Sequence, residues 1–111
     1  MALKNVIDSA TDNFVELNGN KAFDPAIIDV IATIVIDLIV MFQELCGQSA
    51  ADAVATVRNP SWLTKIRLRY RLRQQLGRRD FRTHGRNLEK ALLAVGKNIT
   101  VEQMQELYEE V

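Results

Sequence analysis

The chain has 111 residues, of which 48% are hydrophobic and 25% are charged. This length suits one domain over residues 1–111 that buries about two thirds of its unfolded surface, and the composition is ordinary for a globular protein. The single cysteine, Cys46, excludes an intrachain disulfide and a multi-cysteine zinc site. No signal-peptide pattern opens the chain, so we expect a cytoplasmic protein.

The net charge is zero, but it is unevenly distributed along the chain. Residues 1–57 carry eight acids and two lysines, residues 58–86 carry ten bases and one acid, and residues 87–111 carry five acids and two lysines. The three segments therefore have net charges of −6, +9 and −3. Charge segregation of this kind indicates that the basic segment faces acidic helices of the same chain, those of a neighbouring subunit, or another partner of opposite charge.

The first predicted helix covers residues 3–18, because apolar residues recur there at helical spacing. The most apolar stretch follows, over residues 24–47. Asp24 is a suitable N-cap, and Pro25 suits the first helical position because its missing N–H is not needed there. We predict a long central helix over residues 25–46, ended by Gly47 and covered by protein on most of its sides.

The central helix carries one narrow polar stripe. Between residues 26 and 42 the only polar residues are Asp29, Thr33 and Asp37, which are spaced i, i+4 and i+8 and share one face. Two aspartates near the middle of a membrane span would cost about 2.5 to 3.5 kcal/mol each, so we expect a core helix and keep membrane insertion as the third alternative. We predict that Asp29 and Asp37 are structural anchors that pair with arginines.

Shorter helices are predicted after the central one. Ser49 and Asp52 form a capping-box pattern before residues 50–57, and Thr100 and Gln103 form another before residues 101–111. Between them, Asp80 is a suitable cap for a helix over residues 81–95 that Gly96 closes. The predicted fold is an all-α, single-domain bundle of about six helices around the central one.

Residues 61–77 are ambiguous. Their strict alternation of apolar and basic residues is typical of a half-buried strand, whereas their composition and start signal favour a helix, which we predict. The helix would carry two apolar ridges, which implies two sets of neighbours. One ridge is Trp62, Ile66 and Tyr70, and the other is Leu68, Leu72 and Leu76.

The sequence offers little catalytic chemistry. The only histidine, His84, lies in an arginine-rich stretch that we expect to be exposed, and a Cys46–His84 pair is the weaker interpretation of these two residues. No phosphate-binding loop, dinucleotide fingerprint or HExxH motif is present. We therefore expect no enzyme activity, no cofactor, no metal site and no small-molecule substrate.

The sharpest feature is an arginine-rich segment. Nine of the ten bases in residues 58–86 are arginines, whose planar fork matches phosphates and carboxylates. We expect a self-associating assembly protein, a homo-oligomer that presents this surface to an anionic partner; the alternative is a sequence-independent nucleic-acid-binding module. We expect an accessory or structural protein of a bacterium or its phage, an origin that no sequence motif establishes. The predicted partner-binding residues are Arg67, Arg71, Arg78, Arg79, Arg82 and Arg86.

Overall fold

The computed structural model describes residues 1–19 and 25–111, and over these residues it contains five α-helices and no strand. The all-α prediction is confirmed, and the strand alternative for residues 65–73 is wrong. Asp24, predicted to cap the central helix, lies outside the described residues. The helices are α1 (Ala2–Leu17), α2 (Ala26–Cys46), α3 (Ala50–Arg58), α4 (Trp62–Lys97) and α5 (Val101–Glu110).

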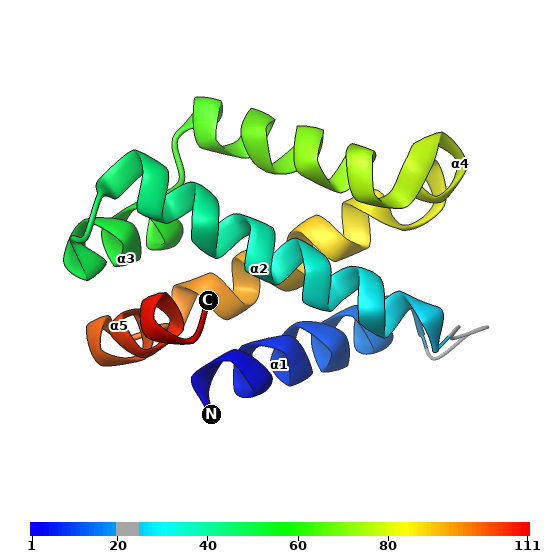
Figure 1. The fold of residues 1–111 in the computed structure, drawn as a ribbon. Coiled ribbons are helices and arrows are strands. Elements are labelled where there is room, and N and C mark those ends of the chain that lie inside the picture. Colours follow the sequence, from blue (N-terminus) through cyan, green and yellow to red (C-terminus); the bar gives the residue numbers. More distant parts are fainter. Residues whose placement is uncertain (20–24) are drawn as a thin grey trace.

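Helix α4 is a hairpin of two helical arms. Gly77 interrupts it with φ 78° and ψ 167°, a backbone conformation that essentially only glycine adopts. The first arm, residues 62–76, and the return arm, residues 78–97, therefore run in opposite directions (Figure 1). We predicted a separate helix for each arm, whereas both arms belong to α4, so about six helices were predicted and five are observed. The predicted cap at Asp80 is wrong, because the helix resumes directly after Gly77.

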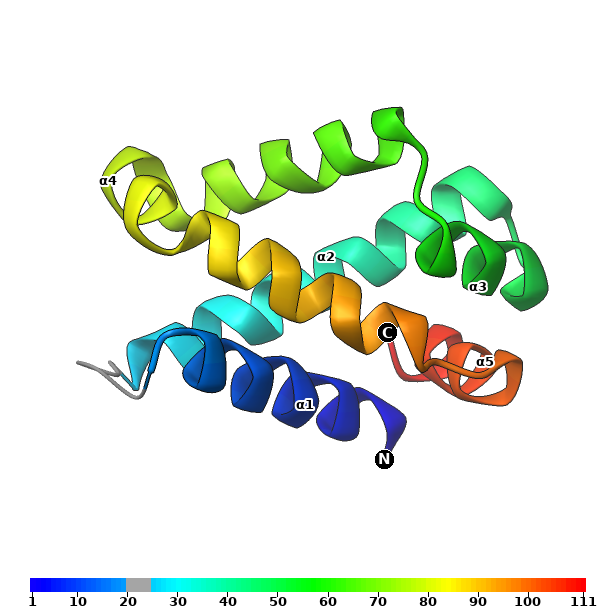
Figure 2. The same cartoon turned by 180° about the vertical axis from the view of Figure 1, so that it is seen from behind.

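Helix α2 lies at the centre of the arrangement. In Figure 1 the first arm of α4 lies above α2 and the return arm passes behind it. Figure 2, seen from behind, shows the return arm crossing α2 beside α1, while α3 and α5 close one end. The core is apolar and is formed where these helices meet. Its largest fully buried side chains are Phe14, Ile31, Ile34, Met41, Leu72, Leu88, Met104 and Leu107.

Protein covers α2 less completely than its sequence suggests. Six of its 21 residues are buried, whereas Ile28 and Ile36 remain exposed. The prediction that protein surrounds this helix on most sides is therefore wrong for the single chain. Among the described helices, α2 is the one that is long and apolar enough to cross a membrane, by length and composition alone.

Gly96 has a packing role that we did not predict. It is buried inside α4, which continues to Lys97, so the predicted helix end at Gly96 is wrong. A Cβ atom placed on Gly96 would lie 2.1 Å from Cγ1 of Val57. Glycine is needed here because α3 approaches the backbone of α4 closely, and this contact seats α3 against the return arm.

The predicted helix starts are largely present. Thr100 and Gln103 form a reciprocal capping box, and the Ser49 hydroxyl accepts a hydrogen bond from the backbone N–H of Asp52. The two ends of the chain also meet, since Oε2 of Glu110 accepts a 2.6 Å hydrogen bond from the backbone N–H of Leu3. A carboxylate at the start of α1 is favourably placed for the helix dipole.

Candidate interaction surfaces

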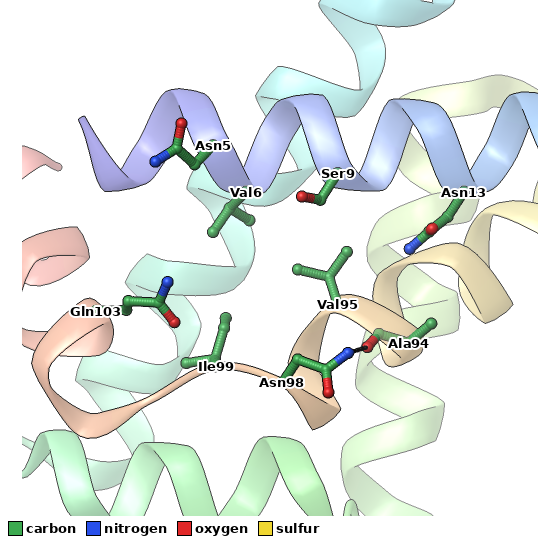
Figure 3. Close-up of a pocket in the computed structure, with 9 residues that line it drawn as sticks. All are labelled: Asn5, Val6, Ser9, Asn13, Ala94, Val95, Asn98, Ile99 and Gln103. Atoms are coloured by element: carbon green, nitrogen blue, oxygen red, sulfur yellow. Dashed lines mark hydrogen bonds between the residues drawn. The ribbon is translucent and has the colours of Figure 1, made fainter.

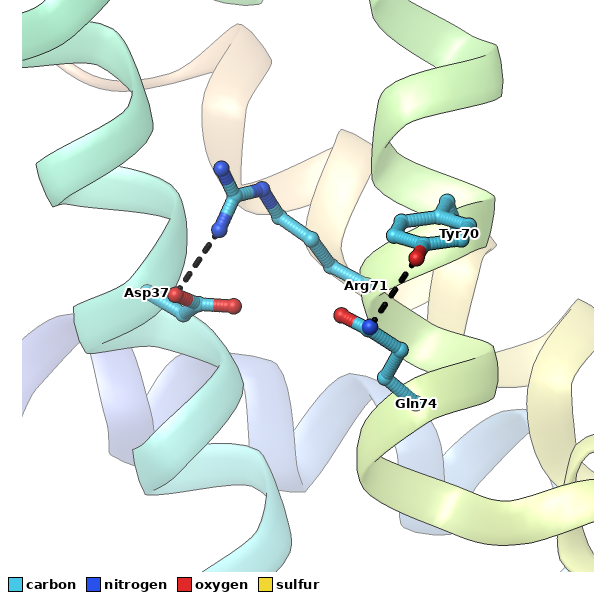
Figure 4. A network of polar contacts seen from close by, with 4 residues as sticks. All are labelled: Asp37, Tyr70, Arg71 and Gln74. Atoms are coloured by element: carbon cyan, nitrogen blue, oxygen red, sulfur yellow. Dashed lines mark hydrogen bonds and ion pairs between the residues drawn. The ribbon is translucent and has the colours of Figure 1, made fainter.

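An ion pair joins α2 to the first arm of α4. Nη1 of Arg71 donates a 2.8 Å hydrogen bond to Oδ1 of Asp37 (Figure 4). The Arg71 side chain is 26% exposed and the Asp37 side chain 31% exposed. Arg71, which the sequence analysis grouped with the partner-binding arginines, is thus engaged inside the chain. The second predicted anchor, Asp29, is exposed and makes no ion pair with the described residues.

Two more basic side chains are engaged within the chain. Nε of Arg69 on the first arm donates to Oε1 of Glu89 on the return arm at 2.8 Å. Nη2 of Arg58 donates to the backbone carbonyl of Ile99, also at 2.8 Å. The Arg69–Glu89 pair joins the two arms, so residues one turn away from each partner lie on the same side of the hairpin.

The remaining arginines of the segment are exposed and make no ion pair with any residue that the structure describes. We call them the arginine surface. Five of them lie on the hairpin near its bend, and Arg67 lies on the first arm beside α2. The arginine surface consists of Arg67, Arg73, Arg78, Arg79, Arg82 and Arg86.

The two predicted ridges of residues 61–77 have different environments. Leu68, Leu72 and Leu76 are buried against the rest of the chain. Trp62 and Tyr70 are 75% and 62% exposed, and Leu63 and Ile66 between them are exposed as well. We call Trp62, Leu63, Ile66 and Tyr70 the apolar ridge. Only one of the two expected sets of neighbours is supplied by the chain itself.

A groove of about 530 Å³ lies beside the apolar ridge, between the first arm and α2. Its apolar lining includes Met41 and Leu45, and its polar lining includes Gln74, whose Nε2 donates to the Tyr70 hydroxyl at 3.1 Å (Figure 4). Glu44 and Arg67 add one charge of each sign. This face therefore combines an exposed apolar ridge, a groove and charges of both signs.

A second groove, of about 300 Å³, lies between α1, the end of α4 and the start of α5 (Figure 3). Asn5, Ser9 and Asn13 line it from α1 at i, i+4 and i+8 spacing, and Asn98 and Gln103 face them. We did not predict this groove from the sequence, although the regular spacing of its polar residues on α1 is a visible signal. It holds no titratable side chain and no nucleophile beside a base, so its geometry offers no catalytic constellation.

His84 and Cys46 lie in different surroundings. His84 is half-buried, so the prediction that it is exposed is wrong. Its ring packs edge-on against that of Phe14, with the two ring centroids 5.6 Å apart. Its Nδ1 is buried without a hydrogen-bond partner. Cys46 lies at the end of α2, with its Sγ 3.8 Å from the Thr56 hydroxyl of α3. The two side chains thus pack against different helices.

The surroundings of Tyr108 raise the pKa of its phenol. Burial raises the pKa of its phenol, and the negative charges of Cys46 and Asp52 raise that pKa further. The hydroxyl is buried without a hydrogen-bond partner. An ionised phenol would therefore be unfavourable here, which gives Tyr108 a packing role rather than that of an acid or base near neutral pH.

No protein-family model, curated protein or solved structure matches the chain. The fold and its surfaces place the molecule in a broad class, that of small all-α proteins. Any functional assignment therefore depends on the chemistry of the surfaces described above.

Proposed function

We propose that the protein is a non-enzymatic assembly protein that self-associates through the apolar ridge and presents the arginine surface to an anionic partner. The observation that carries the proposal is the exposure of Trp62, Leu63 and Tyr70 on one side of the first arm. Contiguous exposed apolar side chains with a polar surround are typical of protein interaction sites. Tryptophan, tyrosine and arginine are also the residues most enriched at binding hot spots.

A second copy of the chain fits this face. The groove beside the ridge is large enough to receive apolar side chains, and ridge and groove both involve the first arm of α4. A twofold interface uses the same surface on both subunits, so a surface that carries both a projection and a recess can be self-complementary. Glu44 and Arg67 at the groove also allow opposite charges to meet across such an interface.

Self-association is tested by the mass of the protein in detergent-free buffer. We expect light scattering after size exclusion to give a fixed multiple of the 12.6 kDa chain mass. The variant Trp62→Glu/Tyr70→Glu places two buried charges in the interface and should run as a 12.6 kDa monomer with unchanged helicity.

The matched control changes two exposed apolar residues elsewhere, Leu17 and Val111, to glutamate. This control should keep the wild-type mass. A wild-type monomer at all accessible concentrations would contradict the proposed self-association. Aggregation that only detergent relieves would instead favour membrane insertion of α2.

A further inference from the structure

The tip of the α4 hairpin carries a dense cluster of positive charge. The antiparallel arms bring arginines that are distant in sequence to the same side of the hairpin. Arg69 and Glu89 pair across the two arms. Arg73 lies one turn from Arg69, and Arg86 lies one turn from Glu89, so both lie on the bend side of this pair. Arg78, Arg82 and Arg86 form an i, i+4, i+8 stripe on the return arm. We call Arg73, Arg78, Arg79, Arg82 and Arg86 the tip cluster.

Few carboxylates offset the tip cluster. Within the hairpin, Asp80 is exposed among these arginines, and Glu89 is engaged by Arg69. The tip cluster makes no ion pair with the described residues. Like charges held on one helical stripe repel one another, so an external polyanion would stabilise this arrangement.

The tip cluster differs from the apolar ridge in one decisive respect. From residue 71 to residue 100, the structure exposes no large hydrophobic side chain, whereas the ridge exposes four. A protein partner normally requires an apolar centre in its interface. Interfaces with nucleic acids are more polar and much more positively charged, and arginine matches phosphate oxygens with two parallel hydrogen bonds.

We infer that the anionic partner of the tip cluster is a nucleic acid, bound through its phosphates without sequence readout. This inference rests on the proposed function, because it names the partner of the arginine surface. None of the tip-cluster arginines lines the two grooves described above, so we place the contacts to a nucleic-acid backbone on the exposed surface of the hairpin. Phosphate contacts of this kind position a protein on nucleic acid but carry no sequence information.

The test is fluorescence anisotropy of a labelled 20-base-pair duplex and of a labelled single strand, titrated with the full chain at several salt concentrations. Five phosphate contacts on duplex DNA predict a slope of log K against log salt of about −4.5, which is about a 500-fold loss of affinity between 50 and 200 mM salt. Duplexes of unrelated sequence should bind equally well.

A charge-matched pair of variants locates the contacts. Arg82→Gln/Arg86→Gln should lower the slope by about 1.8, because two phosphate contacts are lost. Lys4→Gln/Lys97→Gln removes the same charge from exposed positions outside the tip cluster and should leave the slope unchanged. Equal effects of the two variants would overturn the assignment to the tip cluster.

Two further outcomes would overturn the inference. One is the absence of binding to either DNA at 50 mM salt, and the other is equal displacement of DNA by poly-glutamate, which would indicate a carboxylate partner. Both outcomes are independent of the oligomer mass. The proposed self-association can therefore stand while the nucleic-acid inference fails, and the reverse also holds.

Discussion

Gly96 provides the sharpest test of the helix packing. In the change Gly96→Ala, the new Cβ would lie 2.1 Å from Cγ1 of Val57, against about 3.5 to 4.0 Å for an ordinary carbon contact. Val57 cannot easily turn away, because a β-branched side chain on a helix has one strongly preferred rotamer. Overpacking costs about 1 to 3 kcal/mol, and the better helix propensity of alanine returns about 1 kcal/mol. We expect a net destabilisation of up to about 2 kcal/mol.

The assay is urea unfolding followed by far-UV circular dichroism, and its control is the same change in a Val57→Ala background. There the nearest remaining atoms of residue 57 are Cβ and O, both 3.5 Å from the new Cβ, which is ordinary contact. In that background Gly96→Ala should be neutral or stabilising by up to about 1 kcal/mol. Equal destabilisation in both backgrounds would refute the close approach of α3 to α4.

Three further changes probe single features of the fold. Gly77→Ala meets no atom within 4 Å but forces an L-residue into the bend conformation, so urea unfolding should show a loss of about 1 to 3 kcal/mol; an unchanged midpoint would contradict it. Asp37→Asn should cost no more than about 1 kcal/mol, and nothing in an Arg71→Gln background; a loss that persists there would mean that the ion pair is not the cause. For Tyr108→Phe, thermal unfolding at pH 7 should show a slightly higher Tm, because a buried hydroxyl without a partner is removed. The folded-state pKa of Tyr108 lies above its ordinary value of 10.0, so above pH 10 the phenol ionises first in the unfolded chain and the folded state loses stability relative to it. The wild type should therefore lose more stability than Tyr108→Phe between pH 9 and pH 11, and parallel losses would count against this reasoning.

The candidate surfaces could be predicted only in part. The helix predicted over residues 61–77 carries two apolar ridges, and the chain buries Leu68, Leu72 and Leu76 but leaves Trp62 and Tyr70 exposed. Helical spacing alone could not determine which ridge faces the core, because both ridges consist of large hydrophobic side chains at the same spacing. The groove lined from α1 was missed because its walls come from three separate elements.

Local sequence determined the helices of this protein. Spacing of apolar residues and the caps at Ser49 and Thr100 act within a few residues, so the helix class and most helix ends follow from them. The predictions for Asp80 and Gly96 are wrong: both residues suit helix ends, but the structure places both inside α4.

Tertiary structure alone decided how the charges are used. Arg69 and Arg71 look like their neighbours in sequence, yet Glu89 and Asp37 engage them while the tip cluster remains exposed. The Arg69–Glu89 pair depends on the bend at Gly77, which brings two distant stretches of α4 together, and the Arg71–Asp37 pair depends on the packing of the first arm against α2. Pairing of charges is a long-range property of the packed chain, because a carboxylate acts on an arginine only when the fold places it within a few ångströms.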